Sequence, residues 1–528
     1  MINAQQKKLL QDLAAKHGTP VLVVDHEKIR QNYLEFKEKL PTVQAYFAVK
    51  ANSNPDIVKT MYDMGASFDV ASFQEFMMVY NNIKHLQEKD RQQYIWDNII
   101  YANTIKPASI LKKLNIYKPL VTFDNIEELK KIKKNAPDVR LVLRIRVPNT
   151  GSMVELSSKF GVHPGEAVDL MEEASKLELS VEGISFHVGS QCNNFENYVL
   201  ALSLASSIFK EAKLRGLDIG FTDKDGKKMK VLDIGGGFPV KYTPDVKPFP
   251  MLAKKINSEI KRMFNGDVDV IAEPGRFMVA NSCTLVTKII GKSIRDGKTC
   301  YYLDDGVYNT FSGQVYDHQL YPLHSFKDGK ETENKLCATF GPTCDAFDTI
   351  SLSDELPEDL EIDDLLYAEN MGAYTTASSS FFNGFKPTKI IGKSIRDGKT
   401  CYYLDDGVYN TFSGQVYDHQ LYPLHSFKDG ENKICATFGP TCDAFDTISL
   451  SDELPEDLEI DDLLYAENMG AYTTASSSFF NGFKPTKIIA INKCAPGDPC
   501  SCGSGKKFKD CGILNTAEHT SLYHAMNK

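Results

Sequence analysis

Several polar side chains in this sequence come directly after short apolar runs, where side chains can be held for chemistry. Lys50 ends the run AYFAVK. A lysine whose pKa falls in an apolar pocket can attack a carbonyl group and form an imine. The alternative is a strand-end lysine that extends its ammonium group to solvent. The positions that share this placement are Lys50, Asp69, Arg144, His187, Gly235, Gly236, Gly237, Glu273 and Arg276.

Each of these residues has a chemical and a structural interpretation. GGGFP at 235–239 follows the run VLDI, and its glycines either let backbone N–H groups approach a phosphate or form a tight turn. In EPGR, Glu273 could keep a pyridine nitrogen protonated, or it could pair with Arg276 at a helix start. His187 could stack on a flat ring, act as an acid or serve as a hydrogen-bonded structural histidine.

Asp69 and Arg144 could lie near a ligand or form a structural ion pair. Taken together, these residues supply an amine, a phosphate cradle, a carboxylate for a ring nitrogen and a planar group for stacking. Those are the requirements of pyridoxal phosphate. The sequence therefore predicts pyridoxal 5'-phosphate as the cofactor.

The elements that must position these side chains alternate along the chain. Eight strand-like runs are separated by helical patterns, at residues 43–50, 67–72, 98–103, 120–125, 141–147, 181–189, 230–237 and 268–275. Such alternation predicts parallel βαβ units, and this number of strands favours a closed (β/α)8 barrel over residues 26–280. A doubly wound open sheet is the alternative. In a barrel the candidate residues would meet at the rim formed by the strand ends.

A near-identical repeat follows the predicted barrel. Residues 291–391 recur as 392–489, with three extra residues in the first copy. Each copy has short strand-like pieces separated by turns, which predicts an all-β domain present in two tandem copies, 281–391 and 392–492. The repeat arose either by duplication or by an error in assembling the gene.

Residues 1–25 contain a helix and the strand-like run PVLVVD, which we expect to join a β-domain. Only one such run exists for two copies, so at least one copy is expected to have an open sheet edge. We expect the first copy to take the position directly after the barrel, because its connection to EPGR is undisturbed. The second is then appended, or replaces the first by swapping.

Composition limits the class of protein. The 528 residues are 42% hydrophobic and 25% charged, with a formal net charge of -10. This is typical of a globular protein and argues against nucleic acid as a partner. No run reaches the roughly 18 apolar residues of a membrane span. We therefore expect no membrane partner and a cytoplasmic location.

Ten ordered motifs carry a family resemblance: YFAVKAN, FDVAS, FHVGSQC, LDIGGGFP, EPGRFMVA, DDGVYNTF, YDHQLYP, GPTCDAFD, ENMGAYT and SSFFNGF. With them the chain resembles the fold-type III pyridoxal-phosphate decarboxylases, which act on ornithine, lysine, arginine or diaminopimelate. Within this family it is most similar to the ornithine decarboxylases. The resemblance implies an alanine racemase-like fold, a barrel followed by a β-domain.

The resemblance also implies residue roles. Lys50 would hold the cofactor covalently, Glu273 would pair with the pyridine nitrogen and His187 would stack on the ring. Asp69 and Arg144 match positions close to the cofactor. The phosphate would be surrounded by Ser190, Gly235, Gly236, Gly237, Arg276 and either Tyr374 or Tyr472.

Further implied residues lie in the repeat. The catalytic cysteine of GPTCD is Cys344 or Cys442, and in the family it reaches the active site of the partner subunit and governs protonation of the decarboxylated carbon. The distal amine of the substrate would meet Asp345 or Asp443, and Asp317 or Asp418. Such a shared site requires a head-to-tail homodimer. Outside the family context, GPTCD could hold a small buried cysteine and YDH could be turn chemistry.

The implied reaction is decarboxylation of L-ornithine to putrescine, a step of polyamine biosynthesis. Two carboxylates at the far end would repel a distal carboxylate, which argues against diaminopimelate. Lysine stays a second substrate, because one methylene changes binding by only about 1–3 kcal/mol. The alternatives are an arginine or diaminopimelate decarboxylase of the same fold and an inert relative that binds a regulatory partner.

The tail PCSCGSGKKFKDCG, within residues 493–528, resembles the short zinc-binding SEC-C motif. Cys500, Cys502 and Cys511 have spacing suited to zinc. The expected fourth ligand position is Gly512, so Cys494, His519 or His524 would have to substitute. Zinc in the tail is an expectation on this basis, and the tail is expected to mediate binding.

Overall fold

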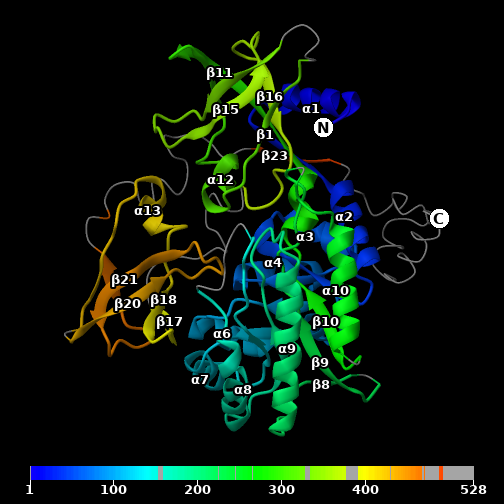
Figure 1. The fold of residues 1–528 in the computed structure, drawn as a ribbon, viewed down its shortest axis with the longest axis vertical. Helices are drawn as coiled ribbons and strands as arrows, with labels where there is room; N and C mark the ends of the chain where they lie inside the picture. The colour runs from blue at the N-terminus through cyan, green and yellow to red at the C-terminus, as the bar shows by residue number, and fades with distance from the viewer. Residues whose placement is uncertain are drawn as a thin grey trace.

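The computed structural model describes residues 2–152, 159–223, 225–243, 245–264, 266–327, 333–375, 390–428, 430–466, 469 and 487–491. Figure 1 shows a barrel with two β-sheet bodies beside it. We call residues 283–375 the first sheet module and residues 390–466 the second sheet module.

The barrel is closed by parallel strands. Its sheet runs β10-β2-β3-β4-β5-β6-β7-β9, and β10 also pairs with β9, which closes the ring. A short strand, β8 (Phe221–Thr222), is attached to β9. The strands are β2 (Val43–Ala48), β3 (Ser67–Val70), β4 (Ile99–Tyr101), β5 (Leu120–Phe123), β6 (Arg140–Arg144), β7 (Val181–Ser185), β9 (Lys228–Asp233) and β10 (Val268–Ala272). The predicted (β/α)8 barrel is confirmed, and the open sheet is excluded.

Helices surround the barrel and bury their apolar faces on it. Side chains of β3 and β5 are buried throughout, as expected for parallel strands covered on both faces. Local signals start the helices: Asn54 caps α3, with Pro55 in its first turn, and Ser72 caps α4. The helices are α2 (His26–Lys39), α3 (Pro55–Asp63), α4 (Phe73–Ile83), α5 (Glu88–Asn98), α6 (Ala108–Tyr117), α7 (Ile126–Asn135), α8 (Ala167–Lys176), α9 (Glu196–Leu214) and α10 (Phe249–Met263).

The first sheet module continues directly from the barrel through the short helices α11 (Arg276–Val279) and η3 (Ala280–Ser282). Its strands are β11 (Cys283–Arg295), β12 (Lys298–Leu303), β13 (Leu323–Ser325), β14 (Asn334–Phe340), β15 (Thr349–Pro357) and β16 (Leu365–Ala368), with α12 (Gly313–Tyr316) between them. The sheet order is β13-β16-β11-β12-β14-β15.

The N-terminal strand crosses over to this module, as predicted. After α1 (Ala4–His17), β1 (Val21–Asp25) pairs antiparallel with β11, with Val21 opposite Val286. The first module therefore has the expected connection to both the barrel and the N-terminal segment.

The second sheet module has strands in a similar order. β17 (Ile390–Arg396), β18 (Lys399–Leu404), β20 (Asn432–Phe438) and β21 (Thr447–Pro455) form one sheet in the order β17-β18-β20-β21. A pair of strands, β19 (Leu424–Ser426) and β22 (Leu464–Ala466), lies beside it, and α13 (Gly414–Tyr417) precedes β19. In the described residues β17 has no counterpart of β1, but the barrel covers it: Lys131 of α7 donates to the carbonyl of Ile391 at 2.6 Å.

The chain then returns to the first module. β23 (Lys487–Ile491) pairs parallel with β1, with Val21 opposite Lys487 and Val23 opposite Ile489. The strand that follows the second copy of the repeat thus extends the sheet of the first copy. The sequence analysis did not predict this pairing.

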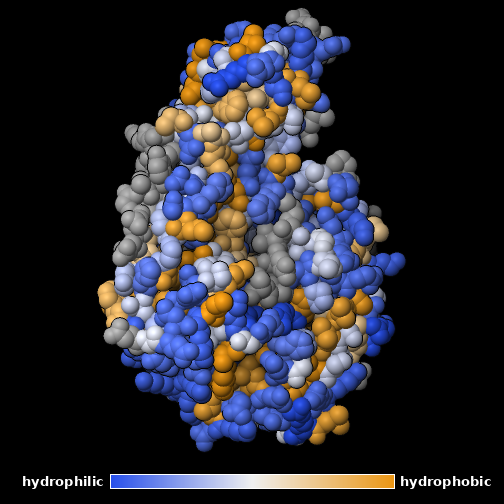
Figure 2. All heavy atoms as spheres, turned by 60° about the vertical axis from the view of Figure 1, so that its left-hand side comes forward, coloured by the Kyte–Doolittle hydropathy of each residue, from blue (hydrophilic) through white to orange (hydrophobic). Residues whose placement is uncertain are grey.

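The face of the molecule shown in Figure 2 is mainly hydrophilic. On the face shown in Figure 2, hydrophobic side chains appear between hydrophilic ones in separate patches. Among the helices of the described residues, we find none with the length and apolar character needed to cross a bilayer.

Candidate active site

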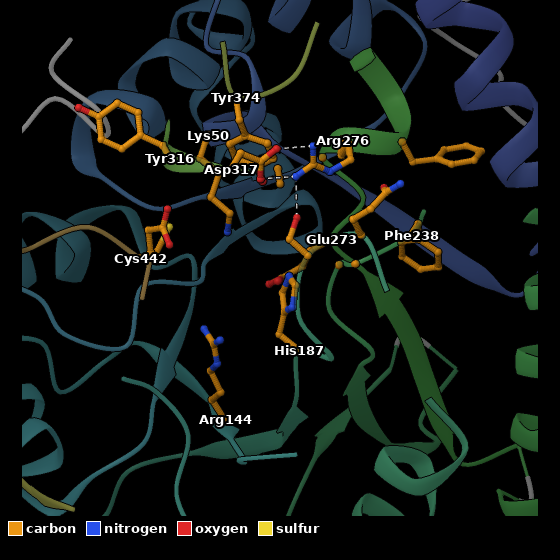
Figure 3. A pocket seen from close by; sticks show the side chains of 18 of the residues that line it. Lys50, Arg144, His187, Phe238, Glu273, Arg276, Tyr316, Asp317, Tyr374 and Cys442 are labelled. Carbon is orange, nitrogen blue, oxygen red and sulfur yellow. Dashed lines mark hydrogen bonds and ion pairs between the residues drawn. The ribbon is translucent and has the colours of Figure 1, made fainter. Parts of the chain in front are cut away.

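A cavity lies where the carboxyl ends of the barrel strands meet both sheet modules (Figure 3). Barrel residues, first-module residues and second-module residues all line it. The predicted site residues that line the cavity are Lys50, Arg144, His187, Ser190, Gly236, Gly237, Glu273, Arg276, Asp317, Tyr374, Cys442 and Asp443.

Lys50 follows strand β2 in the short helix η1 (Val49–Ala51), and its side chain extends into the cavity. Its Nζ lies 3.1 Å from Oδ2 of Asp69, at the end of β3. Burial lowers the pKa of Lys50, but Asp69, with Cys442 and Glu273, outweighs burial and raises this pKa well above its usual value. The facing carboxylate of Asp69 therefore reverses the fall in the pKa that burial alone would cause.

The glycine turn follows β9 and packs tightly against its neighbours. Gly235 and Gly237 have φ values of +65° and +93°, a region that favours glycine. A Cβ on Gly236 would lie 2.9 Å from Nε2 of His187 and 2.8 Å from the carbonyl oxygen of Glu273. The turn therefore requires glycine for its backbone shape and for close approach as well.

Glu273 faces a second carboxyl group, that of Asp233 at the end of β9. Burial and the neighbouring Asp233 raise the pKa of Glu273 well above its usual value, and burial raises that of Asp233 to about 7. Burial and the neighbouring Asp233 therefore both disfavour the ionised form of Glu273. The sequence analysis did not single out Asp233, although its position as the last residue of a strand before GGG was a usable signal.

His187 is held as a neutral ring. Its Nδ1 accepts a hydrogen bond from the backbone N–H of Gly189 at 3.0 Å, which leaves the proton on Nε2. Burial, with the positive charges of Arg144 and Lys50, lowers the pKa of His187 well below its usual value. Among the alternatives, a neutral planar ring favours stacking over acid catalysis.

Arg276 begins α11 and occupies the other end of the cavity. It forms a two-bond ion pair with Asp317, with N–O distances of 2.6 and 2.5 Å. It also donates to Oγ of Ser190 at 2.7 Å, and its guanidinium lies 5.0 Å from the ring centre of Tyr374. Arg276, Ser190 and Tyr374, all expected around a phosphate, are therefore together.

Asp317 was expected at the distal amine of the substrate, and in the structure its charge is balanced by Arg276. Its role in substrate binding stays a prediction. The alternative residue, Asp418, is exposed and does not line this cavity.

The second module supplies the cysteine of the cavity. Cys442 is buried, and burial raises the pKa of its thiol to about 12 against the opposing effect of Lys50. Asp443 beside it accepts a hydrogen bond from the Tyr409 hydroxyl at 2.5 Å. The corresponding Cys344 is exposed, and Asp345 instead accepts from Tyr308 outside the cavity.

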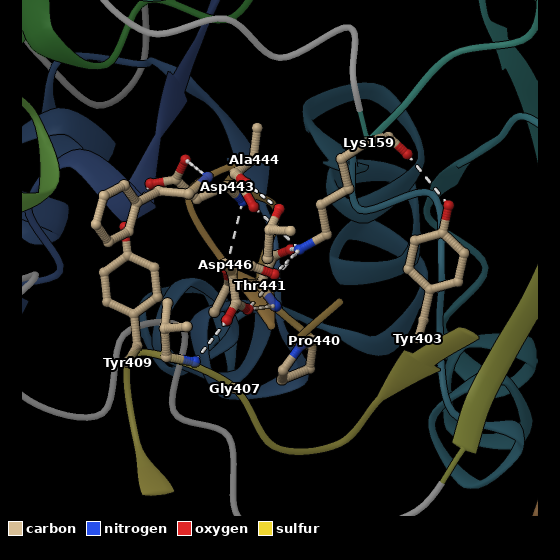
Figure 4. Close-up of polar contacts among 12 residues, drawn as sticks. Lys159, Tyr403, Gly407, Tyr409, Pro440, Thr441, Asp443, Ala444 and Asp446 are labelled. Carbon is tan, nitrogen blue, oxygen red and sulfur yellow. Dashed lines mark hydrogen bonds and ion pairs between the residues drawn. The ribbon is translucent and has the colours of Figure 1, made fainter. Parts of the chain in front are cut away.

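A buried lysine fixes the loop that carries Cys442 (Figure 4). Lys159 Nζ donates to the carbonyl oxygens of Thr441 and Asp443 at 2.8 and 3.0 Å. Its side chain is fully buried, and it lies 3.8 Å from the carboxylate of Asp446. The sequence analysis missed Lys159, which has no motif of its own and acquires a role only where the two parts of the chain meet.

Other predicted residues fall outside the described part of the chain. These are Tyr472 and the tail cysteines Cys500, Cys502 and Cys511. Within the described residues, no group of His, Cys, Asp and Glu side chains is arranged to hold a metal ion. Zinc in the tail therefore stays an expectation.

The residues present fit pyridoxal phosphate. Within the described chain, Asp69 Oδ1, Asp233 Oδ2 and Arg276 Nε are buried without a hydrogen-bond partner, a costly state that a polar ligand can relieve. The amine of Lys50, the neutral ring of His187, the carboxyl of Glu273 and the glycine turn all border one cavity. Its charges and its shape therefore suit an aldehyde-bearing, phosphorylated pyridine.

Comparison with known proteins also points to pyridoxal phosphate as the cofactor. Residues 26–280 match the pyridoxal-binding domain of the pyridoxal-dependent decarboxylases, and residues 385–470 match their C-terminal sheet domain. The chain is 38% identical over 385 residues to the lysine/ornithine decarboxylase of Selenomonas ruminantium, covering 72% of this chain and 91% of that protein. The chain belongs to the pyridoxal-dependent decarboxylase family.

Solved structures of decarboxylases are also similar to this chain. The lysine/ornithine decarboxylase of Vibrio vulnificus complexed with putrescine matches with a TM-score of 0.63 and 34% identity, covering 73% of this chain and 97% of that one. The arginine decarboxylase of Paramecium bursaria Chlorella virus matches with a TM-score of 0.64 and 30% identity, covering 72% and 98%. Nearly all of each relative is matched, while more than a quarter of this chain lies outside the match.

Proposed function

We propose that this chain decarboxylates L-ornithine to putrescine with pyridoxal phosphate, and that L-lysine is a second substrate. The observation that carries the proposal is the meeting of Lys50, Glu273, His187, Cys442 and Asp443 around one cavity. An amine, a ring-nitrogen partner, a stacking ring, a proton donor and a site for a distal cation are then within one enclosure.

The bound cofactor supplies an electron-withdrawing ring that accepts the electron pair released when CO2 leaves the amino acid. Glu273 would hold a proton at the ring nitrogen, since burial and the neighbouring Asp233 raise the pKa of Glu273 well above its usual value. His187 stacks as a neutral ring, so it adds no positive charge to the face it covers. Lys50 would bind the aldehyde, and Asp69, 3.1 Å from its Nζ, could take up or return the proton of the amine.

Cys442 keeps its proton at neutral pH, because burial raises the pKa of its thiol to about 12. It can therefore deliver that proton to the substrate Cα after CO2 leaves. Arg276, Ser190 and the glycine turn would bind the phosphate and so position the ring relative to these groups.

Substrate selection rests on Asp443. Because Arg276 balances the charge of Asp317, Asp443 is the carboxylate with which a distal ammonium group can pair. A distal carboxylate would be repelled there, which disfavours diaminopimelate. An arginine decarboxylase is the alternative assignment, because the chain is also similar to a viral arginine decarboxylase.

The test is CO2 release from ornithine, lysine, arginine and diaminopimelate at equal concentration. We expect ornithine to be used best, lysine next and diaminopimelate least. Faster release from arginine would overturn the substrate assignment. No release from any of them, with cofactor added, would overturn the proposal in favour of an inert relative.

A further inference from the structure

The two sheet modules contact each other through equivalent residues. By the sequence repeat, Tyr308 corresponds to Tyr409 and Tyr316 to Tyr417. The rings of Tyr308 and Tyr417 stack with their centres 4.5 Å apart, and those of Tyr316 and Tyr409 stack at 4.6 Å. The equivalent hydroxyls of Tyr316 and Tyr417 lie 2.8 Å apart. Each contact is therefore repeated with the two modules exchanged.

A second set of contacts is also repeated with the two modules exchanged. Phe347 meets Tyr417 edge to face with ring centres 5.6 Å apart, and its equivalent, Phe445, meets Tyr316 at the same distance. A cleft between the modules is lined by equivalent pairs, among them His318 with His419 and Gln314 with Gln415. This reciprocity is the defining property of a two-fold dimer interface.

The second module also docks on the barrel through a polar and apolar interface. Asn103 donates to the carbonyl of Pro440 at 3.1 Å, and Arg146 forms a two-bond ion pair with Asp397 at 3.0 and 3.1 Å. Ile105 and Phe160 of the barrel share a buried apolar cluster with Ile391, Tyr403 and Phe438. Together with the Lys159 contacts, this interface holds Cys442 at the cavity.

The first module has equivalent residues at these positions, but they are not buried to the same extent. Tyr403, Phe438 and Cys442 are 1%, 2% and 8% exposed. Their equivalents are more exposed: Tyr302 and Phe340 are half-buried, and Cys344 is exposed. The first module instead supplies Asp317 and Tyr374 to the cavity.

We propose that the second module replaces a partner subunit, so that one chain holds one complete active site and works as a monomer. The proposal rests on the proposed function, because it concerns the same cavity. Cys442 and Asp443 then act within their own chain, and the Cys344 loop is left without a barrel to complete. The homodimer implied by the family resemblance is not needed for the site.

A complementation experiment tests this. Full-length Lys50→Ala and Cys442→Ala chains are prepared separately, checked for folding by circular dichroism, and also co-expressed. Each lacks a residue of its own site, so co-expression should give no more ornithine decarboxylation than the sum of the two. If sites were shared between chains, random pairing would restore about a quarter of wild-type activity, since half the dimers would have one intact site of two. That recovery would overturn the proposal.

The matched control is Cys344→Ala, which changes the equivalent cysteine outside the cavity. We expect it to keep wild-type activity, whereas Cys442→Ala should lose at least tenfold. Equal losses in the two variants would contradict the assignment. Sedimentation velocity of the wild-type chain supplies a readout independent of activity and should give the 59.0 kDa monomer. A stable dimer would overturn the proposal, whereas a monomer inactive on every substrate would remove the proposed function instead.

Discussion

At the scale of single residues, the ionisation of Lys50 is determined by the groups that face it. Asp69 lies 3.1 Å away and stabilises the ammonium form despite burial. The sequence analysis identified the lysine from its place after an apolar run, but not its charge state. That state depends on a carboxylate on the next strand, so no local pattern could predict it.

Replacement of Lys50 by alanine should remove both cofactor attachment and turnover. We expect ornithine decarboxylation to fall by at least about 10³-fold, and the visible absorbance band of lysine-linked pyridoxal phosphate to disappear. Absorbance spectra of the wild type and variant with added cofactor measure this. Lys112→Ala, an exposed lysine on α6, is the control and should leave the band intact. An unchanged band in Lys50→Ala would show that Lys50 does not hold the cofactor.

The paired carboxyls Asp233 and Glu273 also make stability depend on pH. Their pKa values are raised in the fold, to about 7 for Asp233, so both groups stabilise the fold fully below the ordinary carboxyl pKa. They lose that effect as pH rises through their raised pKa values. Each unit of raised pKa corresponds to about 1.4 kcal/mol of unfolding free energy.

Asp233→Asn should weaken this dependence in the cofactor-free protein. We expect the unfolding free energy of the wild type, relative to the variant, to fall between pH 4 and 7, because only the wild type must ionise two adjacent carboxyls. Urea titrations across this range measure the unfolding free energy of each protein. The lowered pKa of His187 makes stability rise with pH in both proteins, so this effect cancels when the two unfolding free energies are subtracted. A difference that does not change with pH would contradict the raised pKa values of Asp233 and Glu273.

At the scale of elements, the barrel strands were predictable because parallel strands covered on both faces are continuous apolar runs. The runs that contain Lys50, Asp69 and Gly237 fall on β2, β3 and β9. The pairing of β23 with β1 was not predictable, because it joins residues at opposite ends of the chain. Lys159 was missed for the same reason, since its partners lie more than 280 residues away.

The turn after β9 offers a test of cofactor geometry. Gly236→Ala would put a Cβ within 3 Å of His187 and Glu273 without backbone strain. We expect the affinity for pyridoxal phosphate to fall at least tenfold, about 1.4 kcal/mol. Titration of the apoprotein followed by absorbance measures it. Gly165→Ala, where the nearest atom belongs to the exposed His163 ring at 3.3 Å, should bind normally. Unaltered affinity in Gly236→Ala would exclude the turn from the cradle.

At the scale of the whole molecule, the two copies of the repeat have different roles, which their nearly identical sequences could not reveal. The sequence offered Cys344 or Cys442, and Asp345 or Asp443, with no local difference to choose between them. The two copies differ in how they dock: Lys159 donates to the GPTCD loop of the second module, and Ile105 and Phe160 of the barrel pack against the sheet of that module. Reciprocal contacts between the modules keep this arrangement in register.

Deletion of residues 392–489 should convert the chain into an obligate dimer. The deletion leaves the sequence KIIAI that forms β23, so the first module keeps its strand beside β1. Cys344 must then be supplied by a second chain. Sedimentation velocity should show a dimer for the shortened chain and a monomer for the full one. A fully active shortened monomer would show that the second module is dispensable.

Specific activity toward L-ornithine over a dilution series of the full chain tests the central claim most directly, because it asks whether Lys50 and Cys442 of one chain suffice. The account predicts activity that stays constant per milligram down to nanomolar protein, with cofactor kept in excess. Activity that falls steadily with dilution, or none at any concentration, would contradict it.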